Sequence, residues 1–160
     1  MRALGLAVEL PSPNRPSLRA VLLEDTLQAT SIPTLADISV VDLFEVTTPD
    51  EGRALQLMDL AEATSGRIRS LNPDIVVVRR ADMQPRPSNA DGPRVRLLAT
   101  GAVTAAARIL VVKTTLRMGK ECGAAYGAKK NDVDVDAATL VDRKMVAAAA
   151  AALCGLVADR

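Results

Sequence analysis

One stretch of this 160-residue chain, residues 48–80, constrains the fold more than any other. Between residues 51 and 71, apolar side chains recur at helical spacing with charged residues on the other faces, which predicts an amphipathic helix. Thr48-Pro49-Asp50-Glu51 has the form of a capping box, with a hydroxyl at the N-cap and a carboxylate three residues later. The face expected to be buried consists of Ala54, Leu57, Met58, Ala61, Ile68 and Leu71.

The helix is predicted to end at Asn72-Pro73-Asp74, because the residue before a proline is pushed out of the helical region. Ile75-Val76-Val77-Val78 follows as an unbroken β-branched run, which is typical of a strand covered on both faces. A helix that leads back to an interior strand indicates a layered α/β domain.

The same patterns divide the rest of the chain into elements of a single domain, residues 1–160. Strands are predicted at residues 3–9, 18–24, 38–46 and 109–112, with turns at 10–17. A helix is predicted at 94–107, with Leu97, Leu98, Gly101, Ala102 and Ala105 on its buried side. The prolines of residues 83–93 predict a flexible loop, and the glycines of 116–131 a basic connection. One last helix is predicted from Asp136 or Thr139 to about residue 158.

Composition excludes several classes of site. The chain has no histidine, which removes His-based acid–base catalysis and His metal ligands. Cys122 and Cys154 lack metal-site spacing, and we expect free thiols in a reducing compartment. Phe44 and Tyr126 are the only aromatic residues, so the chain has almost no side chains on which nucleic-acid bases could stack. Without a signal peptide or a long apolar span, we expect a soluble cytoplasmic protein that does not contact membranes.

The net charge of +1 conceals an uneven distribution along the chain. Residues 79–130 contain eleven Lys and Arg against three acidic residues, a net charge of +8, and the remaining residues carry −7. Such a division predicts a positive surface for polyanions if these residues gather in space. The alternative is a scatter of solvated Lys and Arg side chains.

The order of elements resembles the ribonuclease H-like fold, and within it the RuvC-type Holliday-junction resolvases. The residues that carry the resemblance are Gly5-Leu6-Ala7 in the first strand, Leu71 to Val78, Leu98-Ala99-Thr100-Gly101-Ala102, Val112-Lys113 with Gly119, and the closing helix at 146–154. The resemblance implies a mixed sheet of about five strands flanked by helices. An antiparallel hairpin and a third strand would come first, and two parallel strands would follow.

The chemistry of that family requires carboxylates that hold Mg²⁺ ions, which prefer hard oxygen ligands. The resemblance places these carboxylates at positions occupied here by Ala7, Arg79, and Lys144 with Ala147. It therefore implies the fold without the reaction, and we expect no catalytic residue, no metal and no cofactor. As an alternative, Glu9, Asp82 and Asp142 could form a displaced Mg²⁺ cluster; the simpler interpretation is that they are surface charges.

The basic residues favour nucleic-acid binding over catalysis. The family's topology would gather six of them at one face: Arg79, Arg80, Arg117, Lys120, Lys129 and Lys130. Lys and Arg contact phosphates without reading sequence, so we expect duplex or branched DNA as the partner. Two alternatives stay open: a Mg²⁺-dependent, structure-selective endonuclease and a non-catalytic scaffold or assembly subunit. The resemblance also implies a homodimer, with the helix at 51–71 as an interface element.

Overall fold

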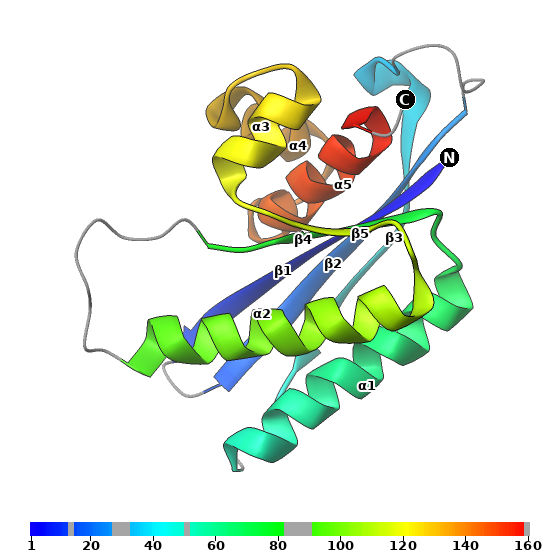
Figure 1. Cartoon of the computed structure of the whole chain (residues 1–160). Helices are drawn as coiled ribbons and strands as arrows, with labels where there is room; N and C mark the ends of the chain where they lie inside the picture. Colours follow the sequence, from blue (N-terminus) through cyan, green and yellow to red (C-terminus); the bar gives the residue numbers. More distant parts are fainter. Residues whose placement is uncertain (13–14, 27–32, 50–51, 82–90, 159–160) are drawn as a thin grey trace.

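A five-stranded mixed sheet organises the computed structural model, which describes residues 1–12, 15–26, 33–49, 52–81 and 91–158 (Figure 1). The strands are β1 (Arg2–Ser12), β2 (Arg15–Asp25), β3 (Ile38–Thr47), β4 (Ile75–Arg79) and β5 (Thr114–Arg117). They lie in the order β3-β2-β1-β4-β5; β1 and β2, and β2 and β3, pair antiparallel, whereas β4 is parallel to both β1 and β5. The predicted sheet is confirmed.

Helices cover both faces of this sheet (Figure 1). On one face, α1 (Arg53–Leu71) and α2 (Asp91–Leu110) pack on Leu4, Leu6 and Val8 of β1. On the other, α3 (Gly119–Tyr126), α4 (Lys130–Leu140) and α5 (Val146–Ala158) belong to a second core with Ala3 and Ala7. Two short 3-10 turns, η1 (Leu35–Asp37) and η2 (Arg143–Met145), precede β3 and α5. Within the described part of the chain, no helix combines the length and apolar composition needed to cross a membrane.

The helix of the 48–80 stretch is present, but its predicted N-cap is wrong. Gly52 is the N-cap, and Asp50 and Glu51 lie outside the described residues. The buried Thr48 hydroxyl instead donates to the carbonyl oxygen of Pro16 at 2.8 Å, because Thr48 continues past the end of β3 alongside β2. The predicted end is confirmed: Asn72 adopts a left-handed conformation with φ of 47° and closes α1.

The predicted buried face of α1 is also partly wrong. The buried residues are Gln56, Leu60, Thr64 and Ile68, whereas Ala54 and Met58 are exposed. The two polar residues can be buried because each has a nearby backbone partner. Gln56 Nε2 donates to Pro49 O at 2.9 Å, and Thr64 Oγ1 donates to Leu60 O at 2.6 Å. Hydrophobic periodicity does not anticipate polar groups that are satisfied in this way.

Helix α2 is longer than predicted, and the face that it buries is not the predicted one. It begins at Asp91, since Pro93 in the first turn needs no hydrogen-bond partner, so the loop prediction is wrong for residues 91–93. Residues 83–90 of the predicted loop lie outside the described residues. Small and β-branched residues are buried, namely Val95, Ala99, Thr100, Val103, Ala106 and Ala107, and they allow close packing against α1 and the sheet. Leu97 and Leu98 are 63% and 53% exposed.

The strand predicted at 109–112 is wrong. Ile109 and Leu110 continue α2, and the strand is β5, which begins at Thr114. The basic connection predicted at 116–131 contains helix α3, closed by Gly127 with φ of 82°, and the first turn of α4. The prediction of one last helix is also wrong, because residues 141–145 separate two helices, α4 and α5.

The alanine-rich helix α5 lies directly on the backbone of β1. Ala148 to Leu156 are all buried, with the sheet on one side and α3 and α4 on the other. A Cβ placed on Gly5 would overlap the carbonyl oxygen of Ala148 and lie 2.5 Å from the nitrogen of Ala152. Glycine at position 5 and short side chains on α5 therefore allow helix and strand backbones to touch.

This contact predicts that Gly5→Ala destabilises the domain by about 2–3 kcal/mol or more, because backbone atoms of α5 cannot move aside locally. The measurement is urea unfolding followed by circular dichroism. Gly66→Ala on the exposed side of α1 is the matched control, since its added methyl meets no described atom within 4 Å. In a helix interior it should stabilise by about 0.5–1 kcal/mol. Equal effects of the two substitutions would contradict the close approach.

Candidate nucleic-acid interface

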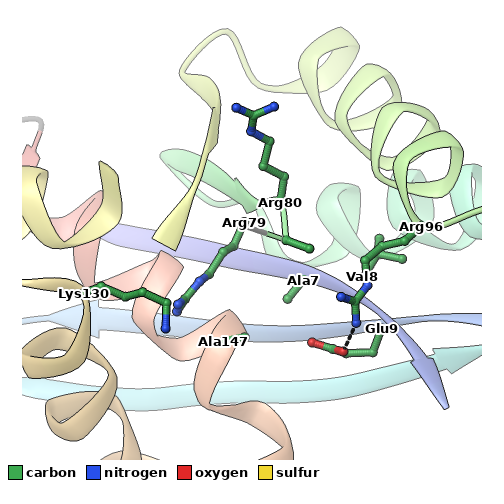
Figure 2. Close-up of a pocket in the computed structure, with 9 residues that line it drawn as sticks. Ala7, Val8, Glu9, Arg79, Arg80, Arg96, Lys130 and Ala147 are labelled. Atoms are coloured by element: carbon green, nitrogen blue, oxygen red, sulfur yellow. Dashed lines mark hydrogen bonds and ion pairs between the residues drawn. The ribbon is translucent and has the colours of Figure 1, made fainter. Parts of the chain in front are cut away.

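A hollow of about 240 Å³ opens where the ends of β1 and β4 meet α2, α4 and α5 (Figure 2). Its lining residues are Ala7, Val8, Glu9, Arg79, Arg80, Ala81, Arg96, Lys130 and Ala147. Ala7, Arg79 and Ala147 occupy three of the positions at which the family resemblance placed carboxylates, and the structure brings these three together. Lys144, the fourth, does not line the hollow; it lies in η2 with its ammonium 3.9 Å from Glu45.

A row of charged residues crosses the whole sheet at the level of Ala7. The strand register places Glu45, Arg19, Ala7, Arg79 and Arg117 opposite one another on β3, β2, β1, β4 and β5. Registered residues on neighbouring strands, about 4.8 Å apart, direct their side chains to the same face. Three arginines therefore share the α5 face of the sheet, with the methyl group of Ala7 between them.

Arg79 is fixed by a carboxylate from a distant part of the chain. Its Nη1 and Nη2 donate to the two oxygens of Asp134 on α4, at 2.5 and 3.2 Å, and the Arg79 side chain is only 9% exposed. Lys130 Nζ donates to Asp134 Oδ2 at 2.9 Å. Figure 2 shows the Arg79 and Lys130 side chains turned toward each other near Ala147. Burial alone would raise the pKa of Asp134, but hydrogen bonds from Arg79 and Lys130 and their charges hold that pKa below its usual 3.8.

Two glycines of α3 make this arrangement possible. A Cβ on Gly119 would lie 2.7 Å from Arg79 Nη2 and from the Cε of Lys130. A Cβ on Gly123, one turn later, would lie 2.5 Å from the backbone nitrogen of Lys130. The absence of side chains at both positions lets the first turn of α4 and the guanidinium of Arg79 pack directly on α3.

The other basic residues predicted to bind nucleic acid lie around the cluster of Arg79, Lys130 and Asp134. Arg117 pairs with Arg79 in the strand register, and the carbonyl of Arg117 accepts a hydrogen bond from the amide of Arg80 at 3.0 Å. Lys120 and Lys129 are exposed in the residues that open α3 and α4. Arg80 also lines the hollow, although its side chain points away from that of Arg79 (Figure 2). The six residues predicted to bind nucleic acid thus lie around one end of the sheet.

The alternative carboxylates are differently placed. Glu9 lines the hollow but is paired with Arg96 of α2, at 2.5 Å between Oε2 and Nη2 (Figure 2). Asp142 is exposed in the loop after α4, and Asp82 lies outside the described residues, so this set stays a prediction. Among the residues that the structure describes, no three His, Cys, Asp or Glu side chains gather to hold a metal ion.

The described residues at the hollow do not suit Mg²⁺. The ion needs several oxygen ligands, whereas Ala7 and Ala147 present methyl groups and Arg79 presents a cation at these positions. Glu9, which lines the hollow, is engaged by Arg96, and Asp134 of α4 is engaged by two of the lining cations, Arg79 and Lys130.

Sequence reasoning missed three residues of this site. Asp134 follows Lys130 by four residues, a helical salt-bridge spacing that could have indicated their contact. Arg19 shares the face of Ala7, but this follows only from the strand register; it donates to Lys144 O at 3.0 Å and to Glu45 Oε1 at 3.4 Å. No sequence signal links Arg96 to Glu9, which lie 87 residues apart.

Cys122 and Cys154 lie close enough to Arg79 and Arg117 for the charges of these arginines to act on both thiols. Both are buried and free, as predicted, on α3 and α5. A hydrogen bond between the thiols lowers the pKa of Cys154 and raises that of Cys122, with burial as a further cause of the rise.

Comparison with protein-family models finds no match for the chain, and comparison with curated protein sequences finds none. A solved structure of Thermus thermophilus RuvC matches with a TM-score of 0.71 at 16% identity, covering 99% of this chain and 96% of that one. T. thermophilus RuvC in complex with Holliday junction substrate matches with a TM-score of 0.70 at 17% identity, covering 100% and 95%. The chain therefore has a RuvC-like, RNase H-like fold, which confirms the resemblance; such low identity shows the fold alone.

The lowered pKa of Asp134 predicts a pH-dependent contribution to stability. At neutral pH, Asp134→Asn should cost about 1–3 kcal/mol, because it removes charge-assisted hydrogen bonds to a largely buried arginine. The folded-state pKa lies below the ordinary value, so the contribution is complete above pH 3.8 and is lost as the pH falls through the folded-state pKa. The measurement is the unfolding free energy of wild type and variant between pH 2.5 and 7, a range chosen to bracket the transition.

The control is Glu62→Gln, which removes an exposed carboxylate on α1. It should leave stability nearly unchanged across the same pH range. A stability difference for Asp134→Asn that did not depend on pH would contradict the role assigned to the ion pair.

Proposed function

We propose that this chain is a RuvC-like domain that binds the phosphate backbone of nucleic acid and has lost nuclease activity. The observation that carries the proposal is the row of Arg19, Arg79 and Arg117 at the place where the resemblance expects metal-binding carboxylates. Like charges side by side in a sheet cost stability. Asp134 and Glu45 offset part of that cost, and the remaining positive charge favours a polyanion.

Duplex or branched DNA is the partner that we propose. A structural neighbour, T. thermophilus RuvC, is known in complex with Holliday junction substrate. Contacts from Lys and Arg to phosphates do not require unstacked bases, which suits a chain with one Phe, one Tyr and no Trp. Exposed Lys120 and Lys129 would extend the contact beyond the hollow.

The endonuclease alternative would need Glu9, Asp82 and Asp142 to converge on Mg²⁺. The Glu9–Arg96 pair disfavours it, because a cation next to a ligand carboxylate competes with the metal. The scaffold alternative predicts that the protein contacts other proteins and that the basic residues have no ligand. A cytoplasmic location is part of the proposal, in keeping with the free thiols of Cys122 and Cys154.

The proposal predicts salt-dependent binding to labelled duplex and four-way-junction DNA, measured by fluorescence anisotropy at several salt concentrations. Lys120→Ala, Lys129→Ala and Arg117→Ala should each weaken binding several-fold and reduce the slope of log affinity against log salt by about one unit. Arg69→Ala is the matched control and should leave binding unchanged, because Arg69 is exposed on α1, which packs on the opposite face of the sheet from α3 and α4.

Two results would refute this proposal in different ways. Absent or salt-insensitive binding would favour the scaffold. Cleavage of the junction in Mg²⁺ or Mn²⁺, abolished by Glu9→Gln, would establish the endonuclease instead.

We also propose that the chain forms a homodimer. The apolar residues exposed on α2 favour this helix over α1 as the interface: Leu97, Leu98 and Ile109 lie on one face, together with the exposed Gly101 and Ala105. Ile109 is 83% exposed, which is costly for an isoleucine in water and is relieved if a second copy covers it.

Analytical ultracentrifugation tests the dimer. Wild type should sediment as a dimer, and Leu98→Glu or Ile109→Glu should convert it to a folded monomer, because burying an unpaired carboxylate is costly. Val135→Glu on α4 is the control, since Val135 is 65% exposed on the other face of the sheet and should not affect association. A monomeric wild type would contradict the proposal.

A further inference from the structure

We propose that the hollow is a metal-independent phosphate-binding site, in which Arg79 and Lys130 supply positive charge where the resemblance expects Mg²⁺. This inference rests on the proposed function and deepens it, because it names the place and the chemistry that receive one phosphate group.

The charges around the hollow favour an anion. Arg79, Arg80, Arg96 and Lys130 line it, against Glu9. Glu9 is paired with Arg96, and Asp134 shares its single charge between Arg79 and Lys130, so the hollow keeps a positive excess. Because the Arg79 side chain is only 9% exposed, its attraction to an anion is screened less than that of a surface arginine.

The space in the hollow suits a small group. Its volume of about 240 Å³ is several times the roughly 30 Å³ that a water molecule occupies. Ala7 and Ala147 contribute only methyl groups to the wall (Figure 2). Carboxylates at these two positions would take up part of the space and repel a phosphate, whereas alanines leave room next to the cations.

The cations are held in place before any ligand arrives. Asp134 fixes the Arg79 guanidinium through two hydrogen bonds, and the bare backbone of Gly119 lies against that guanidinium and the Lys130 side chain. Charges fixed in this way need little reorganisation to bind an anion. The site therefore needs no divalent ion to bring a phosphate to the sheet end.

The decisive comparison is Ala147→Asp against Ala147→Asn. Ala147 is half-buried in the first turn of α5, where an acidic side chain is tolerated by the helix dipole. The two substitutions introduce side chains of the same size, of which only Asp is charged. Affinity for duplex and four-way-junction DNA is measured by anisotropy in EDTA. We expect Ala147→Asn to weaken binding modestly through the space that it fills, and Ala147→Asp to bind at least about tenfold more weakly than Ala147→Asn, because like charges brought together are strongly unfavourable. Added Mg²⁺ should not strengthen wild-type binding.

A second measurement does not depend on a variant that folds. Inorganic phosphate is titrated into the wild-type protein, and amide and arginine side-chain signals are followed by NMR. Saturable shifts at Arg79, Gly119 and Ala147 support the site. Absence of these shifts would contradict it. Tighter binding of a 5′-phosphorylated oligonucleotide than of its 5′-hydroxyl form would identify a terminal phosphate as the ligand; equal binding with both forms shifting the same signals would identify an internal phosphodiester.

The inference and the proposed function fail differently. Equal affinities of folded Ala147→Asp and Ala147→Asn would overturn the phosphate site, as would wild-type binding that requires Mg²⁺. If Lys120→Ala and Lys129→Ala still weakened binding, the proposed function would stand without the hollow. Loss of all salt-dependent binding in wild type would remove the proposed function itself.

Discussion

The contact between α5 and the backbone of β1 at Gly5 is the constraint on which the rest of the structure depends. Helices and sheets usually meet through interlocking side chains, but here the alanines of α5 and the bare Cα of Gly5 let two backbones touch. This close approach brings the first turn of α5 down to the level of Ala7, two residues after Gly5. Ala147 consequently lies at the wall of the same hollow as Ala7.

Arg79 depends on the same geometry. The parallel register of β4 with β1 places Arg79 beside Ala7, and an arginine at this position needs a counter-charge because its side chain is almost completely removed from water. Asp134 supplies it from α4, and Gly119 and Gly123 let α4 approach closely enough. A single basic residue at the end of an interior strand thus explains why a carboxylate and two glycines from two other helices converge there.

Prediction from sequence succeeded where the pattern of a segment is local. The β-branched run of β4 and the end of α1 at Asn72 follow from short-range sterics, and both are present. It failed where two helix faces were almost equally apolar. On α2, Ala99 and Val103 are buried and Leu97 and Leu98 are exposed, because a helix packed closely on a sheet and on α1 favours small residues at the contact. The burial of Gln56 depends on a hydrogen bond to Pro49, which no periodicity contains.

The sequence by itself indicated the order of most strands and the family that the fold resembles, and it has Ala7, Arg79 and Ala147 at positions where that resemblance implies carboxylates. Residue types and their spacing indicate the elements and the first hairpin, whereas the arrangement of the sheet and the carboxylate positions are what the resemblance implies. Tertiary structure alone decided that Arg19 joins the row of Arg79 and Arg117, that Asp134 holds Arg79, and that Arg96 pairs with Glu9. The two ion pairs join residues 55 and 87 positions apart, and they exist only once strand register and helix approach bring the charges within reach of each other.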